Sequence, residues 1–399
     1  MSGAPRLTSG LVATLGFLAA VGPFATDMYL ASFTEIAADL GSSASAVQLT
    51  LTAFLLGIGA GQLLLGPLSD RLGRRPVMVL SMGVFALSSV LMVFTPTIEV
   101  FVALRLVQGV AGAAGIVVAR AIAVDLSEGE TAVRALSLIA TVTALGPLVA
   151  PPIGGAVGVL TDWRGVLIVL AAISAAMFLL AVLVVPESLP PDRRHGGGGR
   201  AIARMLGTVA STRGFGAYTL TVAAAFAGMM AYISASPFVG QEVLGMDPLV
   251  YALGFAAGAL GVVSANLLNA RIAPRVGPGR MLTLGVSFLL LASGILALLA
   301  ITGWLRPASF IGCAVVLTAG AGFTMSNASA LALARTPHMR GSGAAVLGAT
   351  QFVLGGAMSP VVGAWGEDTA VPMAVIVVCA AIAAAGSRLV ARRRLRGSP

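Results

Sequence analysis

Apolar stretches of about 20 residues recur along the whole chain, and short segments that hold most of the charged residues separate them. A helix of about 20 apolar residues is long enough to cross the hydrocarbon core of a bilayer. The pattern therefore predicts an all-α polytopic membrane protein with twelve transmembrane helices. Their expected ranges are 9–32, 45–66, 76–94, 98–121, 133–158, 164–185, 214–237, 249–270, 280–300, 307–334, 341–363 and 371–390.

The longest hydrophilic connection, PESLPPDRRHGGGGRAIARMLGT, follows the sixth predicted helix, and its prolines and glycines are typical of a flexible linker. We therefore expect an N-terminal six-helix bundle over 1–185, a cytoplasmic linker over 186–213, and a C-terminal six-helix bundle with a basic tail over 214–399. The basic segment NARIAPRVGPGRM follows the eighth helix as GPLSDRLGRRPVM follows the second. This weak repeat indicates two pseudo-symmetric halves.

Composition supports the membrane interpretation, because 58% of the residues are hydrophobic, 10% are charged and the mean hydropathy is +0.99. A soluble protein needs roughly 25% charged residues to cover its surface. A formal charge of +9 is also found in nucleic-acid-binding proteins, but here the basic residues are scattered between apolar stretches. We therefore expect membrane lipid, and no nucleic acid, as a partner.

The arginines alternate between the two sides of the predicted membrane. With both termini on one side, 20 of the 24 arginines fall in connections on that side, and only Arg164 and Arg306 fall on the other. Arg105 and Arg120 remain within a predicted helix. Because positive residues favour the cytoplasmic side, both termini are expected to be cytoplasmic.

Two ionisable residues, Asp27 and Arg105, lie well inside predicted helices, both roughly 8–10 Å below the outer surface at 1.5 Å per residue. Such residues are costly in a membrane, so a functional role is the default interpretation. The functional hypothesis makes Asp27 the proton carrier and part of the substrate site. Arg105 would tune this carboxylate and, with Gln108, hold the local polar network. A static Asp27–Arg105 ion pair that only stabilises the bundle is the alternative.

Burial and a nearby arginine change the proton affinity of a carboxylate in opposite directions. Opening the cavity to one side or the other can therefore change that affinity. Protons and substrate would then compete for Asp27, which is what antiport requires.

Four segments, in order along the chain, resemble signatures of the major facilitator superfamily, and within it of the twelve-span drug/proton antiporters. GPLSDRLGRRP resembles the signature between the second and third helices, and LRLVQGVAGAAG that of the fourth. APPIGG resembles the antiporter signature of the fifth helix, with Ala150 in place of its first glycine. ATDMYLASF, followed by SAVQLTLTAFLLGIGAGQ, is similar to bicyclomycin-resistance proteins and chloramphenicol and florfenicol exporters, with Ala31 where proline is usual.

The resemblance implies two halves around a central cavity, and a gate at the charged loop Asp70–Arg75. The arginines alone would hold this loop on the cytoplasmic side as a topological anchor. A single acid among them adds nothing to that anchor, which favours the additional role as a gate. The resemblance further implies that Asp70 docks near Gly341 and Ser342 in the outward-open state, and Arg120 is a candidate partner of Asp70 or Asp125. The expected gating residues are Asp70, Arg71, Gly73, Arg74, Arg75, Arg120 and Asp125.

The resemblance also implies that a bend in the fifth helix seals the path and favours exchange over leak, the alternative being a bend that serves only packing. Each proline removes an intrahelical donor and so favours such a bend. The residues of this antiporter kink are Pro147, Pro151, Pro152, Gly154 and Gly155. In the fourth helix, Gly109, Gly112 and Gly115 have the small-residue spacing that allows close helix packing.

The substrate pocket is expected on the cavity-lining helices, although each candidate could equally serve ordinary helix packing. The candidates are Asp27, Met28, Tyr29, Gln48, Tyr232, Ser236 and Asn327.

No nucleotide-binding glycine loop, zinc-ligand spacing or nucleophile motif is found, so we expect neither an enzyme nor a metal or other cofactor. The sequence predicts a monomeric, proton-coupled secondary active efflux transporter in a bacterial cytoplasmic (inner) membrane. It would export small lipophilic drugs, of chloramphenicol or bicyclomycin type, by alternating access. The alternatives are a dedicated exporter of one metabolite or self-made antibiotic, a passive carrier and a non-transporting receptor.

Overall fold

The computed structural model of the chain describes residues 7–194, 207–209, 211–336, 340–363 and 369–396, and in them twelve helical spans are long and apolar enough to cross a membrane. The predicted number of transmembrane helices is therefore confirmed. In chain order the elements are α1 (Ser9–Ala19), α2 (Val21–Asp27), η1 (Leu30–Ser32), α3 (Phe33–Asp39), α4 (Ala44–Leu72), α5 (Arg74–Val93), α6 (Ile98–Asp125), α7 (Gly129–Leu160), α8 (Trp163–Leu183), η2 (Pro191–Arg193), α10 (Phe215–Phe238), η3 (Val239–Val243), α11 (Pro248–Val276), α12 (Pro278–Ile301), α13 (Pro307–Leu333), α14 (Arg340–Gly363) and α15 (Val371–Arg396).

Several helices end later than predicted, because they continue into the arginine-containing connections. Examples are α4, whose last turn holds Arg71, and α11, whose last turn holds Arg275. Arginine is a good helix former, and a cation near the last carbonyls of a helix is favourable. The change from apolar to polar residues therefore marks the edge of the bilayer rather than the end of the helix.

The first span is broken, whereas the sequence pattern predicts a single helix over 9–32. α1 ends at Ala19, α2 is a short helix, and η1 and α3 complete the span. Pro23 lies in the first turn of α2, where its missing N–H leaves no bond unmade. The break places Asp27 at the last position of α2.

The chain forms two compact units, and their boundary does not simply divide the sequence into a first and a second half. Unit one contains Met1–Leu30 and Ala53–Gly198, and unit two contains Ala31–Thr52 and Gly199–Pro399. Within unit two, the amide of Gln241 donates to the carbonyl of Ala31 (2.9 Å), and the hydroxyl of Thr52 donates to the carbonyl of Gly356 (2.8 Å). These bonds explain why the early segment belongs with the later helices.

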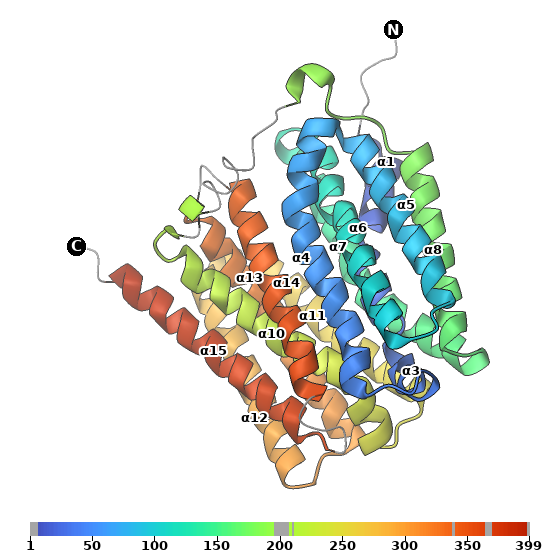
Figure 1. The fold of residues 1–399 in the computed structure, drawn as a ribbon. Helices are drawn as coiled ribbons and strands as arrows, with labels where there is room; N and C mark the ends of the chain where they lie inside the picture. The colour runs from blue at the N-terminus through green and yellow to red at the C-terminus, as the bar shows by residue number, and fades with distance from the viewer. Residues whose placement is uncertain (1–6, 195–206, 210, 337–339, 364–368, 397–399) are drawn as a thin grey trace. The chain divides into compact units, whose positions relative to one another are not determined.

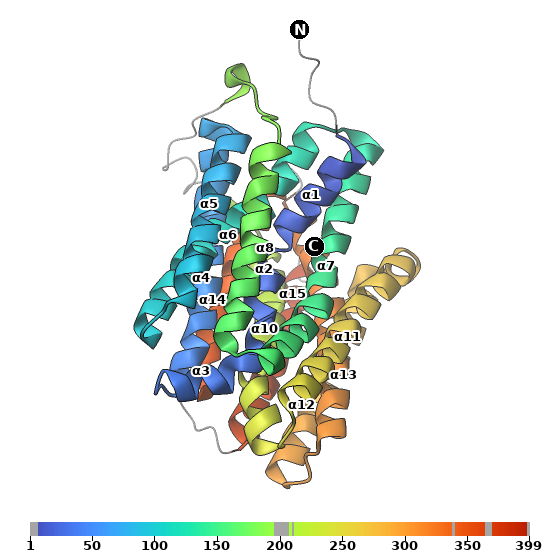
Figure 2. The same cartoon turned by 90° about the vertical axis from the view of Figure 1, so that its right-hand side faces the viewer.

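In unit one, α5 packs against α6 and α8, while α1 packs against α6 and α7 (Figures 1 and 2). The glycines of α6 allow these close approaches. A Cβ at Gly109 would collide with the backbone oxygen of Phe54, and one at Gly115 with the backbone oxygen of Leu18. The predicted packing role of these glycines is confirmed.

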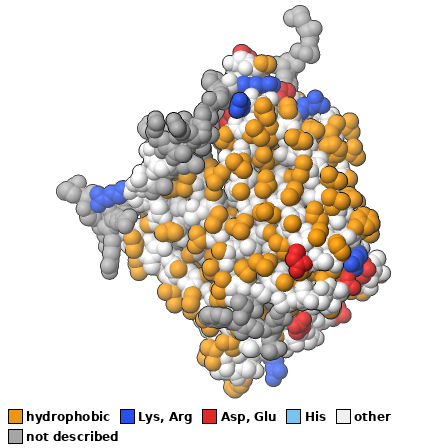
Figure 3. Space-filling model, viewed as in Figure 1, with side chains coloured by type: hydrophobic (Ala, Val, Ile, Leu, Met, Phe, Trp, Pro, Cys, Tyr) orange, Lys and Arg blue, Asp and Glu red, His pale blue; other side chains and the backbone are white. Residues whose placement is uncertain are grey.

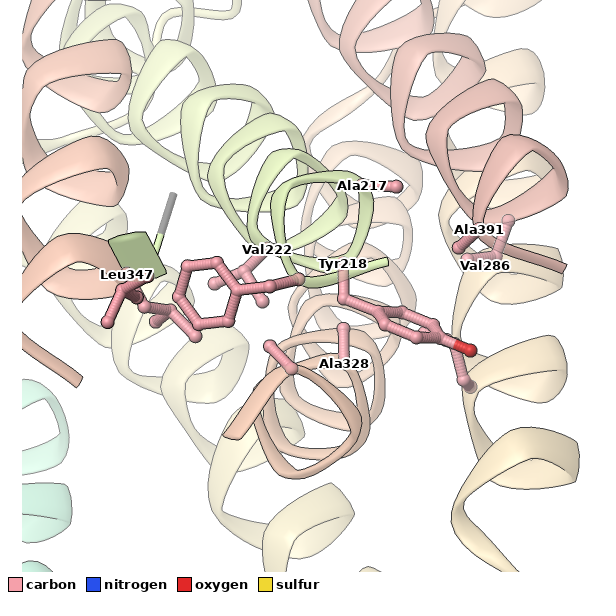
Figure 4. Packing of buried hydrophobic residues seen from close by; sticks show 11 residues of the cluster. Ala217, Tyr218, Val222, Val286, Ala328, Leu347 and Ala391 are labelled. Carbon is pink, nitrogen blue, oxygen red and sulfur yellow. The ribbon is translucent and has the colours of Figure 1, made fainter. Parts of the chain in front are cut away.

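In unit two, α10 is buried along almost its whole length and packs against α13, α14 and α15. Figure 4 shows one layer of this core, in which Tyr218 and Val222 of α10 lie near Ala328 of α13 and Leu347 of α14. The unit therefore has a hydrophobic core of its own around α10.

Large apolar side chains cover the sides of the helices, as expected of a surface that faces hydrocarbon. Leu64 of α4, Leu80 of α5 and Leu298 of α12 are 61%, 71% and 62% exposed. On the face shown in Figure 3, hydrophobic side chains spread over the helices, while arginines and acids lie mostly toward the helix ends. This distribution supports a multi-pass membrane protein.

Candidate functional site

Asp27 is buried in unit one, with 6% of its surface exposed, at the point where α2 ends. The hydroxyl of Thr26 donates a hydrogen bond to its Oδ1 (2.8 Å). In the described part of the chain, Asp27 forms no ion pair. The break in the first span thus places a carboxylate inside the unit with a neutral hydroxyl as its hydrogen-bond donor.

Arg105 of α6 is completely buried, and its guanidinium reaches the same part of α2. Its Nη1 donates to the carbonyl of Ala25 (2.8 Å) and to Oε1 of Gln108 (2.8 Å). Arg105 thus contacts the segment that ends at Asp27, and their common depth in the membrane stays a prediction. The static ion pair between them does not form, because the guanidinium binds the backbone of α2 instead of the carboxylate.

Aromatic rings surround the charge of Arg105. Its Cζ lies 3.8 Å from the ring centre of Tyr29, 5.3 Å from that of Phe101 and 5.8 Å from that of Phe54. The negative face of an aromatic ring attracts a cation, most strongly where water is excluded. The rings therefore provide part of the stabilisation that a buried arginine usually obtains from a carboxylate.

A chain of buried polar side chains extends from Arg105 through α5 to α8. Nε2 of Gln108 donates to Oγ of Ser89 (2.8 Å), and the hydroxyls of Ser89 and Ser174 lie 3.0 Å apart. Sequence reasoning identified Gln108 but missed both serines. A serine in an apolar helix is common, so the sequence offers no signal for this pairing.

A second site lies at the connection between α4 and α5, where Arg74 is the central residue. Its guanidinium pairs with Asp70 (2.6 Å) and Asp125 (3.0 Å) and donates to the hydroxyl of Ser69 (2.7 Å). The side chain of Arg74 is 10% exposed, against 51% for that of Asp70. Three of the predicted gating residues thus form one buried-to-surface ionic network.

Glu187, which follows α8, completes this network and was missed by the sequence analysis. Its carboxylate accepts from the backbone N–H of Arg74 (2.9 Å) and pairs with Arg194 (3.5 Å). Gly73 has φ of 105°, and a Cβ there would collide with the carboxylate of Glu187. The positive φ favours glycine at this position, whereas the side-chain ends that a Cβ would meet can shift.

The other predicted gating residues are placed differently. Arg75 donates to the carbonyl of Val182 (2.9 Å). The expected pairing of Arg120 with Asp70 or Asp125 is wrong, because Arg74 takes both carboxylates and Arg120 forms no ion pair within the described ranges. Asp70 and the start of α14 belong to different units, so the docking of Asp70 there stays a prediction.

α7 contains all three predicted prolines and packs on the broken first span through glycines. A Cβ at Gly146 would lie 2.5 Å from Cβ of Pro23, and one at Gly154 would collide with the backbone oxygen of Met28. Gly146 was not predicted. α7 therefore contacts the first span on both sides of Asp27, through Gly146 before the antiporter signature and Gly154 within it, although the sealing role of this helix stays a prediction.

All the substrate candidates are buried. Ser236 shares a hydrogen bond with Tyr251 (2.7 Å), Tyr232 stacks on Phe255, and the amide of Asn327 donates to Asn269 (2.7 Å). An open cleft of about 530 Å³ in unit one contains none of the candidates, and its lining residues are Val93, Phe94, Thr95, Pro96, Thr161, Asp162, Arg164, Gly165 and Ile168. Their substrate role stays a prediction.

Comparison with known proteins gives consistent matches over nearly the whole chain. The sequence model described as Major Facilitator Superfamily matches residues 15–360. The uncharacterized MFS-type transporter YdgK of Bacillus subtilis is 36% identical over 371 residues, which cover 92% of each chain. The bicyclomycin resistance protein homolog of Haemophilus influenzae is 32% identical over 368 residues, 91% of each chain.

A chloramphenicol resistance protein of Pseudomonas aeruginosa is 30% identical over 394 residues, which cover 97% of this chain and 91% of the relative. Among solved structures, a bacterial homolog of the human lysosomal transporter Spinster, in an inward-facing and unoccupied conformation, superposes with a TM-score of 0.74. It covers 98% of each chain at 16% identity, so this likeness concerns the fold alone.

Proposed function

The chain belongs to the major facilitator superfamily, and we propose that it is a proton-coupled secondary active exporter of small lipophilic drugs. Its relatives and its fold are those of transporters rather than enzymes. The names of two relatives refer to resistance to bicyclomycin and chloramphenicol. These names support export of antibiotics of those two types, by alternating access between the two halves of the fold.

The observation that carries the proton-coupling part is the buried Asp27, which forms no ion pair in the described residues, while Arg105 bonds to the backbone of α2 at Ala25, two residues earlier. A carboxylate binds or releases a proton according to its burial and its neighbours. Movement of α2 against α6 and α7 changes both. Asp27 then carries the proton in one state and releases it in the other, and Arg105 tunes the exchange.

The remaining predicted roles are parts of the same proposal. The network of Arg74 with Asp70 and Asp125 serves as the gate, and the Pro- and Gly-rich part of α7 seals the path around α2. The arginine distribution supports cytoplasmic termini in a bacterial inner membrane. A monomer suffices for this mechanism.

The test compares wild type, Asp27→Asn and Glu99→Gln in proteoliposomes with an imposed pH gradient. Glu99→Gln is the matched control, because it also converts a carboxylate to an amide, but at an exposed position in the first turn of α6. Lumenal pH is followed after addition of chloramphenicol, florfenicol, bicyclomycin or a cationic dye.

Wild type and Glu99→Gln should move protons and accumulate drug against its gradient, and an uncoupler should stop both. Asp27→Asn should lose uphill transport and drug-induced proton movement. Full uphill transport by Asp27→Asn would exclude Asp27 as the carrier. A wild type that responds to none of the four compounds would exclude the proposed drug classes, and export that an uncoupler does not affect would exclude proton coupling.

A further inference from the structure

Four buried side chains form a continuous hydrogen-bonded chain across three helices of unit one. It begins at Ser174 of α8, passes Ser89 of α5 and Gln108 of α6, and ends at Arg105. All four residues have no exposed surface. The proposed function uses Arg105 and gives no role to either serine.

The hydrogen-bonding capacity of each group fixes the direction of this chain. Arginine has only donors, so the atom of Gln108 that faces Arg105 must be its amide oxygen. The amide nitrogen of Gln108 then faces Ser89, whose oxygen must accept. Because a buried amide nitrogen without a partner is costly, Ser89 selects one of the two amide orientations.

Ser174 fixes the position of Ser89 from the other side. The hydroxyl of Ser89 lies 2.7 Å from the carbonyl of Phe85 and 3.0 Å from the hydroxyl of Ser174. A hydroxyl has one donor and two acceptor sites, so Ser89 can accept from Gln108 while it bonds with both of these groups. Ser174 also lies 2.7 Å from the carbonyl of Leu170 on its own helix. The two serines have two hydroxyl protons for these three contacts, so only two of the three are hydrogen bonds at one time, and in each arrangement Ser89 can still accept from Gln108.

We propose that Ser89 and Ser174 are positioning residues for Arg105. They hold the amide oxygen of Gln108 toward the guanidinium, which keeps Nη1 on the carbonyl of Ala25 and the charge over the ring of Tyr29. Arg105 is thereby held on the backbone of α2, two residues before Asp27, and forms no ion pair with that carboxylate. The inference rests on the proposed roles of Asp27 and Arg105 in proton coupling.

The charged residues of the helices that contact α2 are few. In the described residues of α6, α7 and α8 they are Glu99, Arg105, Arg120, Asp125, Glu130, Arg134 and Arg164. Apart from Arg105 these lie near helix ends, and Tyr29 is the other titratable neighbour of the guanidinium. A change in the position of Arg105 should therefore dominate any change at Asp27.

Ser89→Ala removes the acceptor of the Gln108 amide nitrogen, so the amide can turn and Arg105 loses a fixed partner. The guanidinium can then pair with Asp27, which favours the ionised carboxylate. The pH midpoint of drug-induced proton exchange should move to more acidic values by about 0.5–1 unit, the equivalent of one net hydrogen bond. Substrate counterflow without a pH gradient should stay within about twofold of wild type.

The matched control is Ser88→Ala, because Ser88 is also buried on α5 but bonds to the carbonyls of Val84 and Phe85 on its own helix. Ser89→Thr keeps the hydroxyl and should restore the wild-type midpoint. Ser174→Ala should shift the midpoint in the same direction by a smaller amount, and it also tests the inference if Ser89→Ala does not fold.

Measurements on wild type first establish whether drug-induced proton exchange depends on pH. If wild type shows no such exchange, the proposed function itself is wrong. If wild type shows the dependence, equal midpoints for Ser88→Ala, Ser89→Ala and Ser174→Ala would overturn the inference alone. A midpoint that shifts in Ser89→Ala and is not restored in Ser89→Thr would also overturn it, since packing rather than the hydroxyl would then be the cause.

Discussion

Gly154→Ala tests whether the contact of α7 with the end of α2 is as close as the structure shows. The added Cβ would collide with the carbonyl oxygen of Met28 and lie 2.7 Å from its carbonyl carbon and 3.2 Å from its Cα. These are backbone atoms and cannot rotate away. The substitution must therefore move α7 away from α2, one residue from Asp27.

Two opposing free energies set the size of the effect. Alanine stabilises a helix by about 0.5–1 kcal/mol relative to glycine. Overpacking of a close contact costs about 1–3 kcal/mol. Because the obstacle is backbone, we expect the cost to exceed the gain, so that unfolding requires about 1–2 kcal/mol less free energy than in wild type.

Fluorescence-detected thermal unfolding in detergent measures this effect, with Gly294→Ala as the control. Gly294 lies in the middle of α12, and a Cβ there would have no heavy atom within 4 Å. We expect Gly154→Ala to lower the unfolding midpoint by about 1–3 °C and Gly294→Ala to leave it equal or slightly higher. If both variants shift the midpoint equally, α7 does not approach α2 as closely as described, and the packing argument fails.

Three further predictions concern the ionic network, the aromatic rings and unit two. Arg74→Ala should lower the unfolding midpoint in the same assay, because it leaves two carboxylates without their cation, whereas the exposed Arg71→Ala should have little effect; equal effects would contradict the network. Tyr29→Leu should reduce drug-driven proton exchange in proteoliposomes and Tyr29→Phe should retain most of it, because the guanidinium of Arg105 lies over the ring; equal losses would assign the effect to the hydroxyl, which also interacts with Arg105. Gln241→Leu should speed amide hydrogen exchange in and next to α3, because it removes the hydrogen bond from the Gln241 amide to the carbonyl of Ala31, just before α3. Unchanged exchange would show that this bond does not stabilise α3.

The sequence predicted the transmembrane helices well because two independent patterns agree. Apolar length sets the number of spans, and the arginines, of which Arg164 and Arg306 alone fall on the opposite side, exclude a miscount by one helix. The expected common depth of Asp27 and Arg105, which stays a prediction, came from counting residues along two helices of opposite direction. The break in the first span could not be predicted in the same way, because apolar residues continue through it on both sides of Pro23.

The polar contacts of the site were less predictable, since they depend on which side chains of separate helices meet. The predicted topology places both Arg74 and Arg120 toward the same side of the membrane as Asp125. Only the three-dimensional arrangement shows that Arg74 pairs with Asp125. The sequence analysis placed Glu187 in the hydrophilic linker. Its contact with Gly73 and Arg74 has no signature in the local sequence. Ser89 and Ser88 are adjacent and chemically identical, yet one bonds across helices and the other to its own helix.

The assignment of Ala31–Thr52 to unit two has a consequence for dividing the gene. A fragment that starts at Gly199 lacks Ala31, whose carbonyl accepts from Gln241. It also lacks Thr52, whose hydroxyl donates to the carbonyl of Gly356. A fragment that ends at Gly198 carries those residues without their partners. Each half expressed alone would therefore leave polar groups uncovered, and co-expression of the two halves should yield more protein than either one separately.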